Sequence, residues 1–297
     1  METTLFFLGK GGVGKSTSSA LTALALAREG RRVLLVSMDP AHNQSDLFER
    51  RLGERPLEVA DGLRVMEVDQ ERWIQRYLAQ VQGEIRRNYR YLTAFNLEKY
   101  FRVMRHSPGL EEHALLLAYS EIFRRHAGAD VLVFDMAPTA VSLRFFNLPE
   151  LSLVWLQHLL ALRREILAKR ELITRIRLLD REVETDKVLT KLEAMVDRYT
   201  GLRRRFQDAG LTRVHLVLNP DRLSLAESRR IAAELARLRI RVARLVINRV
   251  EEAWDPRPLL AEFPGVPAVA VRRSTGPLVG LAALESFLDS GGFGVPL

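Results

Sequence analysis

Short apolar runs rich in β-branched residues recur along this chain, separated by stretches of strong helix formers. Runs that are apolar at nearly every position are typical of strands buried on both faces, which occur in parallel sheets covered by helices. The pattern therefore predicts an α/β fold with a doubly wound, mainly parallel sheet. The predicted strands are residues 5–8, 33–37, 63–68, 131–134, 214–218, 242–247 and 266–271. Because such sheets bind ligands at the carboxyl ends of their strands, the residues that follow each strand are the candidates for function.

A glycine-rich turn joins the first predicted strand to the helix-forming stretch Ser16–Arg28. Its sequence, GKGGVGKS, fits the phosphate-loop pattern G-x-x-x-x-G-K-[ST] in the strand-to-helix context that this pattern requires. Backbone N–H groups of such a loop surround phosphate oxygens, and the start of the helix adds its positive dipole end. We predict that Lys15 reaches the β and γ phosphates of a nucleotide and that the Ser16 hydroxyl contacts Mg²⁺. The predicted nucleotide-binding residues of the loop are Gly9, Gly11, Gly12, Val13, Gly14, Lys15, Ser16 and Thr17.

Two aspartates follow predicted strands. Asp135 comes directly after the strand 131–134, and Asp39 comes shortly after 33–37, where Pro40 prevents the strand from continuing. An aspartate at the end of an apolar strand is the usual direct or water-mediated Mg²⁺ partner in phosphate-loop enzymes, so Asp135 is predicted to bind Mg²⁺ through water. For Asp39, a strand-ending turn and a role at the nucleotide are equally good interpretations.

Composition narrows the function classes. The chain has 297 residues, a net charge of +8 and no cysteine. The absence of cysteine excludes disulfides, iron–sulfur clusters, thiolate metal sites and cysteine nucleophiles, and the histidines lack the spacing of a metal site. Because its arginines alternate with glutamates, as on solvated helix faces, nucleic acid is not the expected partner. No apolar run is long enough to cross a membrane, so we expect a cytoplasmic protein without a transmembrane segment of its own.

Two long intervals interrupt the alternation of strands and helices. Residues 70–128 and 150–208 are mostly helix-forming and contain no convincing strand. We therefore predict one phosphate-loop ATPase domain over residues 1–297, with these inserts forming a helical subdomain. Within the second insert, Leu151–Leu167 is apolar on nearly every side over its first turns. Such a helix is either buried on two sides or faces a partner.

The motifs together resemble those of the arsenite-pump ATPase (ArsA) and tail-anchored-protein targeting ATPase family, nearly along the whole chain and in order. They are K-G-G-x-G-K-[ST] at residues 10–16, D-P-A-H at 39–42, P-G-x-x-E at 108–112, D-x-A-P-T at 135–139, and the later region from Leu218 to Val250 that contains VINRV.

This resemblance implies an ATP hydrolase that needs ATP and Mg²⁺ and cycles between closed, nucleotide-bound homodimers and open ones. The cycle would bind or deliver a hydrophobic or membrane-protein client, or drive a membrane partner. The resemblance also implies a role for each site residue. Lys10 would be catalytic, reaching across the dimer interface to the partner's nucleotide, and Asp39 would polarise the attacking water. Asp135 would sense the γ-phosphate and Mg²⁺, and Asn248 would hydrogen-bond the adenine edge.

The chain departs from the family pattern in both switch segments. Met136 replaces a threonine, Ala140 and Val141 replace glycine and histidine, and Asn43 and Gln44 replace the more usual serine and leucine. The missing cysteines exclude thiol-dependent arsenite binding and a cysteine-held zinc at the dimer interface.

Two alternative functions stay open. One is a partition-type regulatory ATPase that binds DNA or membrane when ATP-bound, although the C-terminal stretch Leu281–Leu297 lacks the basic residues of a membrane-binding tail. The other is a small-molecule ligase or kinase.

Overall fold

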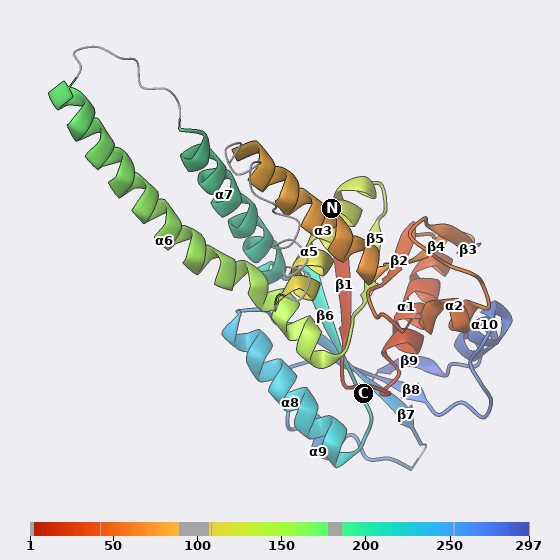
Figure 1. The fold of residues 1–297 in the computed structure, drawn as a ribbon. Coiled ribbons are helices and arrows are strands. Elements are labelled where there is room, and N and C mark those ends of the chain that lie inside the picture. Colours follow the sequence, from red (N-terminus) through yellow and green to blue (C-terminus); the bar gives the residue numbers. More distant parts are fainter. Residues whose placement is uncertain are drawn as a thin grey trace.

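A nine-stranded sheet forms the centre of the molecule (Figure 1). The computed structural model describes residues 3–41, 43–88, 107, 109–177, 186–251 and 253–296. The strands are β1 (Thr3–Leu8), β2 (Val33–Ser37), β3 (Leu57–Ala60), β4 (Leu63–Glu67), β5 (Val131–Asp135), β6 (Thr212–Leu218), β7 (Val242–Val250), β8 (Ala268–Arg272) and β9 (Phe293–Pro296). Their order in the sheet is β3-β4-β2-β5-β1-β6-β7-β8-β9.

The strands from β4 to β8 in this order are parallel, and only the two edge strands, β3 and β9, are antiparallel. The predicted α/β class with a mainly parallel sheet is therefore confirmed, and each predicted strand is present. The sequence reasoning missed β3 and β9. Both are short edge strands; the side chains of β3 are exposed or half-buried, and β9 contains a glycine and a proline, so they lack the continuous apolar run that marks the central strands.

Helices cover both faces of the sheet, and each face has its own apolar core. One core contains side chains of α1, α2 and α10, and the other contains side chains of α3, α5, α6, α7, α8 and α9. The helices are α1 (Lys15–Arg28), α2 (Asn43–Phe48), α3 (Gln70–Asn88), α5 (Leu110–Arg125), α6 (Thr139–Arg177), α7 (Lys187–Gln207), α8 (Arg222–Arg237), α9 (Arg257–Leu260) and α10 (Leu281–Asp289).

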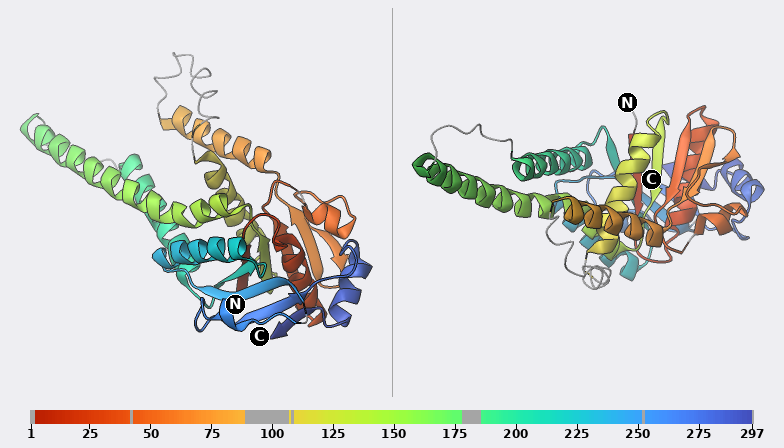
Figure 2. Two further views of the ribbon diagram at one scale, coloured as in Figure 1. Left: turned by 90° about the horizontal axis from the view of Figure 1, so that it is seen from below. Right: turned by 45° about the horizontal axis from the view of Figure 1, so that its top comes forward.

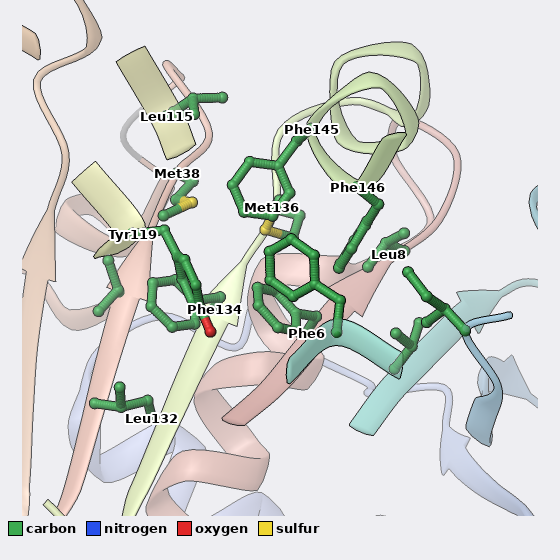
Figure 3. Close-up of a cluster of buried hydrophobic side chains, with 14 of the residues drawn as sticks. Phe6, Leu8, Met38, Leu115, Tyr119, Leu132, Phe134, Met136, Phe145 and Phe146 are labelled. Atoms are coloured by element: carbon green, nitrogen blue, oxygen red, sulfur yellow. The ribbon is translucent and has the colours of Figure 1, made fainter. Parts of the chain in front are cut away.

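A cluster of aromatic side chains fixes α5 and the start of α6 on the sheet (Figure 3). The ring of Phe6 on β1 stacks on that of Phe134 on β5 with centroids 5.2 Å apart, and it meets Phe146 of α6 edge-on at 5.0 Å. Tyr119 of α5 lies 5.3 Å from Phe134. Aromatic pairs at these distances add to the stabilisation from buried area. The cluster therefore ties the base of α6 to the two strands that lead into the glycine-rich loop and Asp135.

The described parts of the intervals 70–128 and 150–208 are helical and contain no strand. The helices α6 and α7 pack side by side and project away from the sheet (Figures 1 and 2). None of the described helices combines the length and the apolar character that crossing a membrane requires.

Candidate nucleotide site

The glycine-rich loop lies between β1, the central strand, and α1. Gly14 immediately precedes α1 and adopts the left-handed backbone conformation with φ 91°. A β-carbon on Gly14 would lie 2.1 Å from Asn248 Nδ2, and a β-carbon on Gly9 would lie 2.2 Å from the Val217 carbonyl oxygen. Real β-carbons do not approach other atoms so closely, so residues 9 and 14 must be glycine for this backbone path.

The two lysines of the loop lie in different environments. Lys15 is the first residue of α1, is only 6% exposed, and has its Nζ atom 3.5 Å from the Lys10 carbonyl oxygen. The Lys10 side chain is exposed and forms no ion pair or side-chain hydrogen bond with the described residues. Lys15 therefore belongs to the loop interior, whereas the Lys10 ammonium is accessible from outside this chain.

The other predicted loop residues lie around this centre. Gly11 and Gly12 are exposed, Val13 is buried, and Ser16 and Thr17 are half-buried in the first turn of α1. The exposed glycines give the loop an open side. His42 of D-P-A-H and Pro108 of P-G-x-x-E lie outside the described residues.

Strand register places the two aspartates at the same edge of the sheet as the loop. Asp135 ends β5 level with Phe7 of β1 and Ser37 of β2, because β5 pairs with both strands. Asp39 follows β2, is 8% exposed, and accepts the backbone N–H of Ala41 on Oδ1 at 3.0 Å. The structure therefore brings the ends of three neighbouring strands, with both carboxylates, to one side of the loop.

Asp135 carries a buried negative charge that the described residues compensate only in part. Full burial raises the pKa of Asp135 to about 6, and the nearby Asp39 charge acts in the same direction. Hydrogen bonds from Ser16 and Gln44 and the charge of Lys15 oppose this shift. One carboxylate oxygen, Oδ1, is buried and has no hydrogen-bond partner among the described residues.

These features fit a divalent cation. A carboxylate that is ionised at neutral pH, has an unpaired buried oxygen and lies beside a serine hydroxyl offers the hard oxygen ligands that Mg²⁺ prefers. The described residues include no group of three His, Asp or Glu side chains that would hold a metal alone. Ser16 and Asp135 could therefore hold Mg²⁺ together with phosphate oxygens and water, which is the usual arrangement for this ion.

Asn248, which the resemblance assigns to the adenine edge, lies against the loop itself. Its Nδ2 donates to the Val13 carbonyl at 2.8 Å, and its Oδ1 accepts the N–H of Arg249 at 2.9 Å. The amide thus connects the end of β7 to the phosphate loop, and contact with adenine stays a prediction.

Two residues of the site were not identified from the sequence. Thr139 Oγ1 donates to the Gly9 carbonyl at 3.3 Å, and Gln44 Nε2 donates to Asp135 Oδ2 at 3.0 Å. A signal for Gln44 existed: residues 44, 47 and 48 share one face of a helix, and the last two, Leu47 and Phe48, are apolar. A polar residue on that buried face, next to the D-P-A-H motif, needs a polar partner.

The fold and the site define a class. A glycine-rich strand-to-helix loop at the carboxyl edge of a doubly wound parallel sheet, with carboxylates on the neighbouring strand ends, is the arrangement of a P-loop nucleotide-binding protein. The sequence pattern of the anion-transporting ATPase family (ArsA) matches residues 2–256. The chain therefore belongs to this family, as its motifs predicted.

Relatives of known name agree with this assignment. The chain is 29% identical over 257 residues to a protein of Aquifex aeolicus named as arsenical pump-driving ATPase 1, a match that covers 83% of this chain and 63% of the relative. It is 32% identical over 247 residues to a second Aquifex aeolicus protein named as arsenical pump-driving ATPase 2, covering 82% of this chain and 79% of the relative. The chain is also 29% identical over 256 residues to a Paramecium tetraurelia protein named ATPase ASNA1 homolog 1, a match that covers 83% of this chain and 74% of the relative. The chain thus spans less than two thirds of the first of these relatives.

Proposed function

We propose that this protein is a Mg²⁺-dependent ATPase that acts as a homodimer in the cytoplasm and binds a hydrophobic segment of a membrane-protein client. The observation that carries client binding is a set of exposed apolar side chains on α6, here called the α6 stripe. The stripe consists of Leu151, Val154, Trp155, Leu159, Leu162 and Ile166.

The α6 stripe occupies one side of a helix whose other side is buried at Leu153, Leu156 and Leu160. Successive members from Leu151 through Trp155, Leu159 and Leu162 to Ile166 are three or four residues apart, which places them on one helical face, and Val154 lies at the edge of this face. Trp155 is 66% exposed and Leu162 is 54% exposed, whereas Leu153, Leu156 and Leu160 are buried. At 1.5 Å per residue the stripe is about 22 Å long, and the roughly 20 residues of a membrane-spanning helix measure about 30 Å. Its length and chemistry therefore suit most of such a helix, and exposed apolar surface of this extent marks an interaction site.

The same helix begins at the nucleotide site. Thr139, the first residue of α6, hydrogen-bonds the loop through Gly9, and α6 runs for 39 residues from there through the stripe. The aromatic cluster at Phe145 and Phe146 holds the base of the helix on the sheet. We regard residues 1–297 as one ATPase domain in which the inserts 70–128 and 150–208 form the client-binding helical subdomain. A movement of residues 135–139 with nucleotide state would reach the stripe along one continuous helix.

Each site residue has a role in hydrolysis under this proposal. Lys15 and the loop N–H groups would bind the phosphates, and Ser16 and Asp135 would hold the cation, which would supply positive charge to neutralise the phosphate oxygens. Asp39, a nearly buried carboxylate at the end of β2, orients and polarises the attacking water.

The exposed Lys10 supports the homodimer. A lysine within the loop that contacts no acid or acceptor in the described part of its own chain is free to approach a second nucleotide. In an interface that excludes water, its positive charge would stabilise the charge that develops on the transferred phosphoryl group much more strongly than in water.

Binding of a model client tests the proposal. The ligand is a fluorescent peptide with a 20-residue leucine and alanine segment, added to Asp39→Asn protein with Mg²⁺-ATP or Mg²⁺-ADP. We expect higher anisotropy with ATP, and a blue shift of the Trp155 emission as its ring leaves water. Leu159→Glu together with Leu162→Glu should abolish both signals. The matched control is Leu223→Glu on α8, where another leucine is 70% exposed. Equal binding by the stripe variant and the control would refute the client site.

A further inference from the structure

Asn43 and Gln44, the first two residues of α2, donate hydrogen bonds to the two residues proposed to hold the cation. Gln44 is fully buried, and its Nε2 lies 3.0 Å from Asp135 Oδ2 and 3.1 Å from the Ser16 carbonyl oxygen. The same nitrogen is 3.2 Å from Ser19 Oγ. Asn43 Nδ2 lies 3.4 Å from Ser16 Oγ. One oxygen of each proposed ligand residue, Asp135 Oδ2 and Ser16 Oγ, therefore faces an amide NH₂ group, the positive end of a dipole, whereas Asp135 Oδ1 has no partner among the described residues.

The orientation of the Gln44 amide follows from charge. If the amide were rotated by half a turn, its oxygen would face the Asp135 carboxylate at hydrogen-bond distance, and two acceptors would repel each other. In the orientation present, Gln44 Oε1 is buried and has no partner among the described residues, and Asp135 Oδ1 is in the same condition. Unpaired buried polar atoms are unfavourable. The amide is thus an incomplete substitute for a positive ion at this carboxylate.

Contacts from Ser45 onward hold α2 in place independently of Asn43 and Gln44. Ser45, the next residue, donates its N–H and its hydroxyl to the two carboxylate oxygens of Glu67 at 2.8 and 2.7 Å. Glu67 ends β4 and is buried. Leu47 and Phe48 are buried in the core beside α1. The helix is therefore anchored from Ser45 onward, and its first two residues contact Ser16 Oγ and Asp135 Oδ2.

We propose that Asn43 and Gln44 are positioning residues that hold Ser16 Oγ and Asp135 Oδ2 while no cation is bound, and that the cation competes with their amides for these two residues. This inference rests on the proposed Mg²⁺ site. Cation binding would break the hydrogen bonds from the Asn43 and Gln44 amides to Ser16 and Asp135. The segment from Ser45 onward would stay in place.

Calorimetric titration of Mg²⁺ into ADP-saturated protein tests the competition without any measurement of turnover. Gln44→Met keeps the size and the buried position of the side chain but removes the donor. We expect it to bind Mg²⁺ about tenfold more tightly than the wild type, because the cation no longer displaces a hydrogen bond to a charged group. Asn43→Ser, at a half-buried position, should change affinity in the same direction by a smaller factor. Gln80→Met, the same substitution at an exposed position of α3, is the matched control and should bind as the wild type does.

Hydrogen exchange gives an independent measurement. In the ADP-bound wild type, addition of Mg²⁺ should speed exchange in a peptide that covers residues 41–44, and in Gln44→Met exchange should be fast with and without Mg²⁺. Equal Mg²⁺ affinity of the wild type and Gln44→Met, with exchange that does not respond to Mg²⁺, would overturn the competition and leave the site standing. Failure of the wild type and of every variant to bind Mg²⁺ would overturn the proposed site and this inference together.

Discussion

Replacement of Gly14 by alanine tests the geometry of the loop directly. The substitution lowers the free energy of unfolding in two ways, through backbone strain and through a steric clash. The left-handed backbone at φ 91° costs an L-residue about 1–2 kcal/mol. The added β-carbon would also lie 2.1 Å from Asn248 Nδ2, so the amide must move. Its bonds to Val13 and Arg249 would be lost, at about 1 kcal/mol each. We therefore expect Gly14→Ala to lower the free energy of unfolding by about 3–4 kcal/mol.

Urea unfolding of the wild type and four variants can separate these terms. Gly12 has φ 78°, but a β-carbon at this position would have no other atom within 4 Å, so Gly12→Ala should show the backbone cost alone, about 1–2 kcal/mol. In an Asn248→Ala background the steric term vanishes, and Gly14→Ala should also cost only about 1–2 kcal/mol, a coupling energy of about 2 kcal/mol. Calorimetry with ATP should show weaker binding by Gly14→Ala, since the loop N–H groups move. If Gly14→Ala costs the same with and without the Asn248 side chain, the close approach at Gly14 does not determine the loop.

Further predictions concern single side chains. Lys15→Ala should abolish Mg²⁺-ATP binding in a calorimeter, and unchanged affinity would refute the phosphate-loop assignment. Asp39→Asn should bind ATP and lose turnover by at least a hundredfold, the usual range for loss of a general base; normal phosphate release would exclude its water-activating role. Lys10→Ala should weaken ATP-dependent dimerisation in sedimentation experiments or slow turnover, and if neither changes Lys10 does not act across an interface. His215 tests pH dependence, because burial, together with the charge of Arg244, lowers its pKa from 6.5 to about 3. Since the unfolded chain takes up this proton first, stability is lost as the pH falls below 6.5, by about 2 kcal/mol between pH 7 and pH 5. Between pH 7 and pH 5, His215→Gln should therefore lose about 2 kcal/mol less stability than the wild type, as measured by urea unfolding at the two pH values. An equal loss in both proteins would contradict the burial of a neutral imidazole.

Local sequence was sufficient for most of the fold. Continuous apolar runs identified the central strands, because a strand buried on both faces needs apolar side chains at every position. The edge strands β3 and β9 did not follow from the same rule, since the side chains of β3 are partly exposed and β9 pairs with β8, which lies more than twenty residues earlier in the chain. The sequence also predicted that the segment forming α6 is helical. The sequence did not predict which face of α6 is buried, because Leu151–Leu167 is apolar on nearly every side. Packing against α7 and the sheet leaves Trp155 and Leu162 exposed.

The sequence by itself determined the loop and its strand-to-helix setting, because glycine, lysine and serine at fixed spacing act over a few residues through backbone conformation and helix geometry. It also placed Asp39 and Asp135 after their strands. Only the tertiary structure decided that Gln44 meets Asp135, 91 residues away, and that Asn248 meets Val13, 235 residues away. Such contacts depend on which strands become neighbours in the sheet. That order follows from the packing of the whole core and from no single segment.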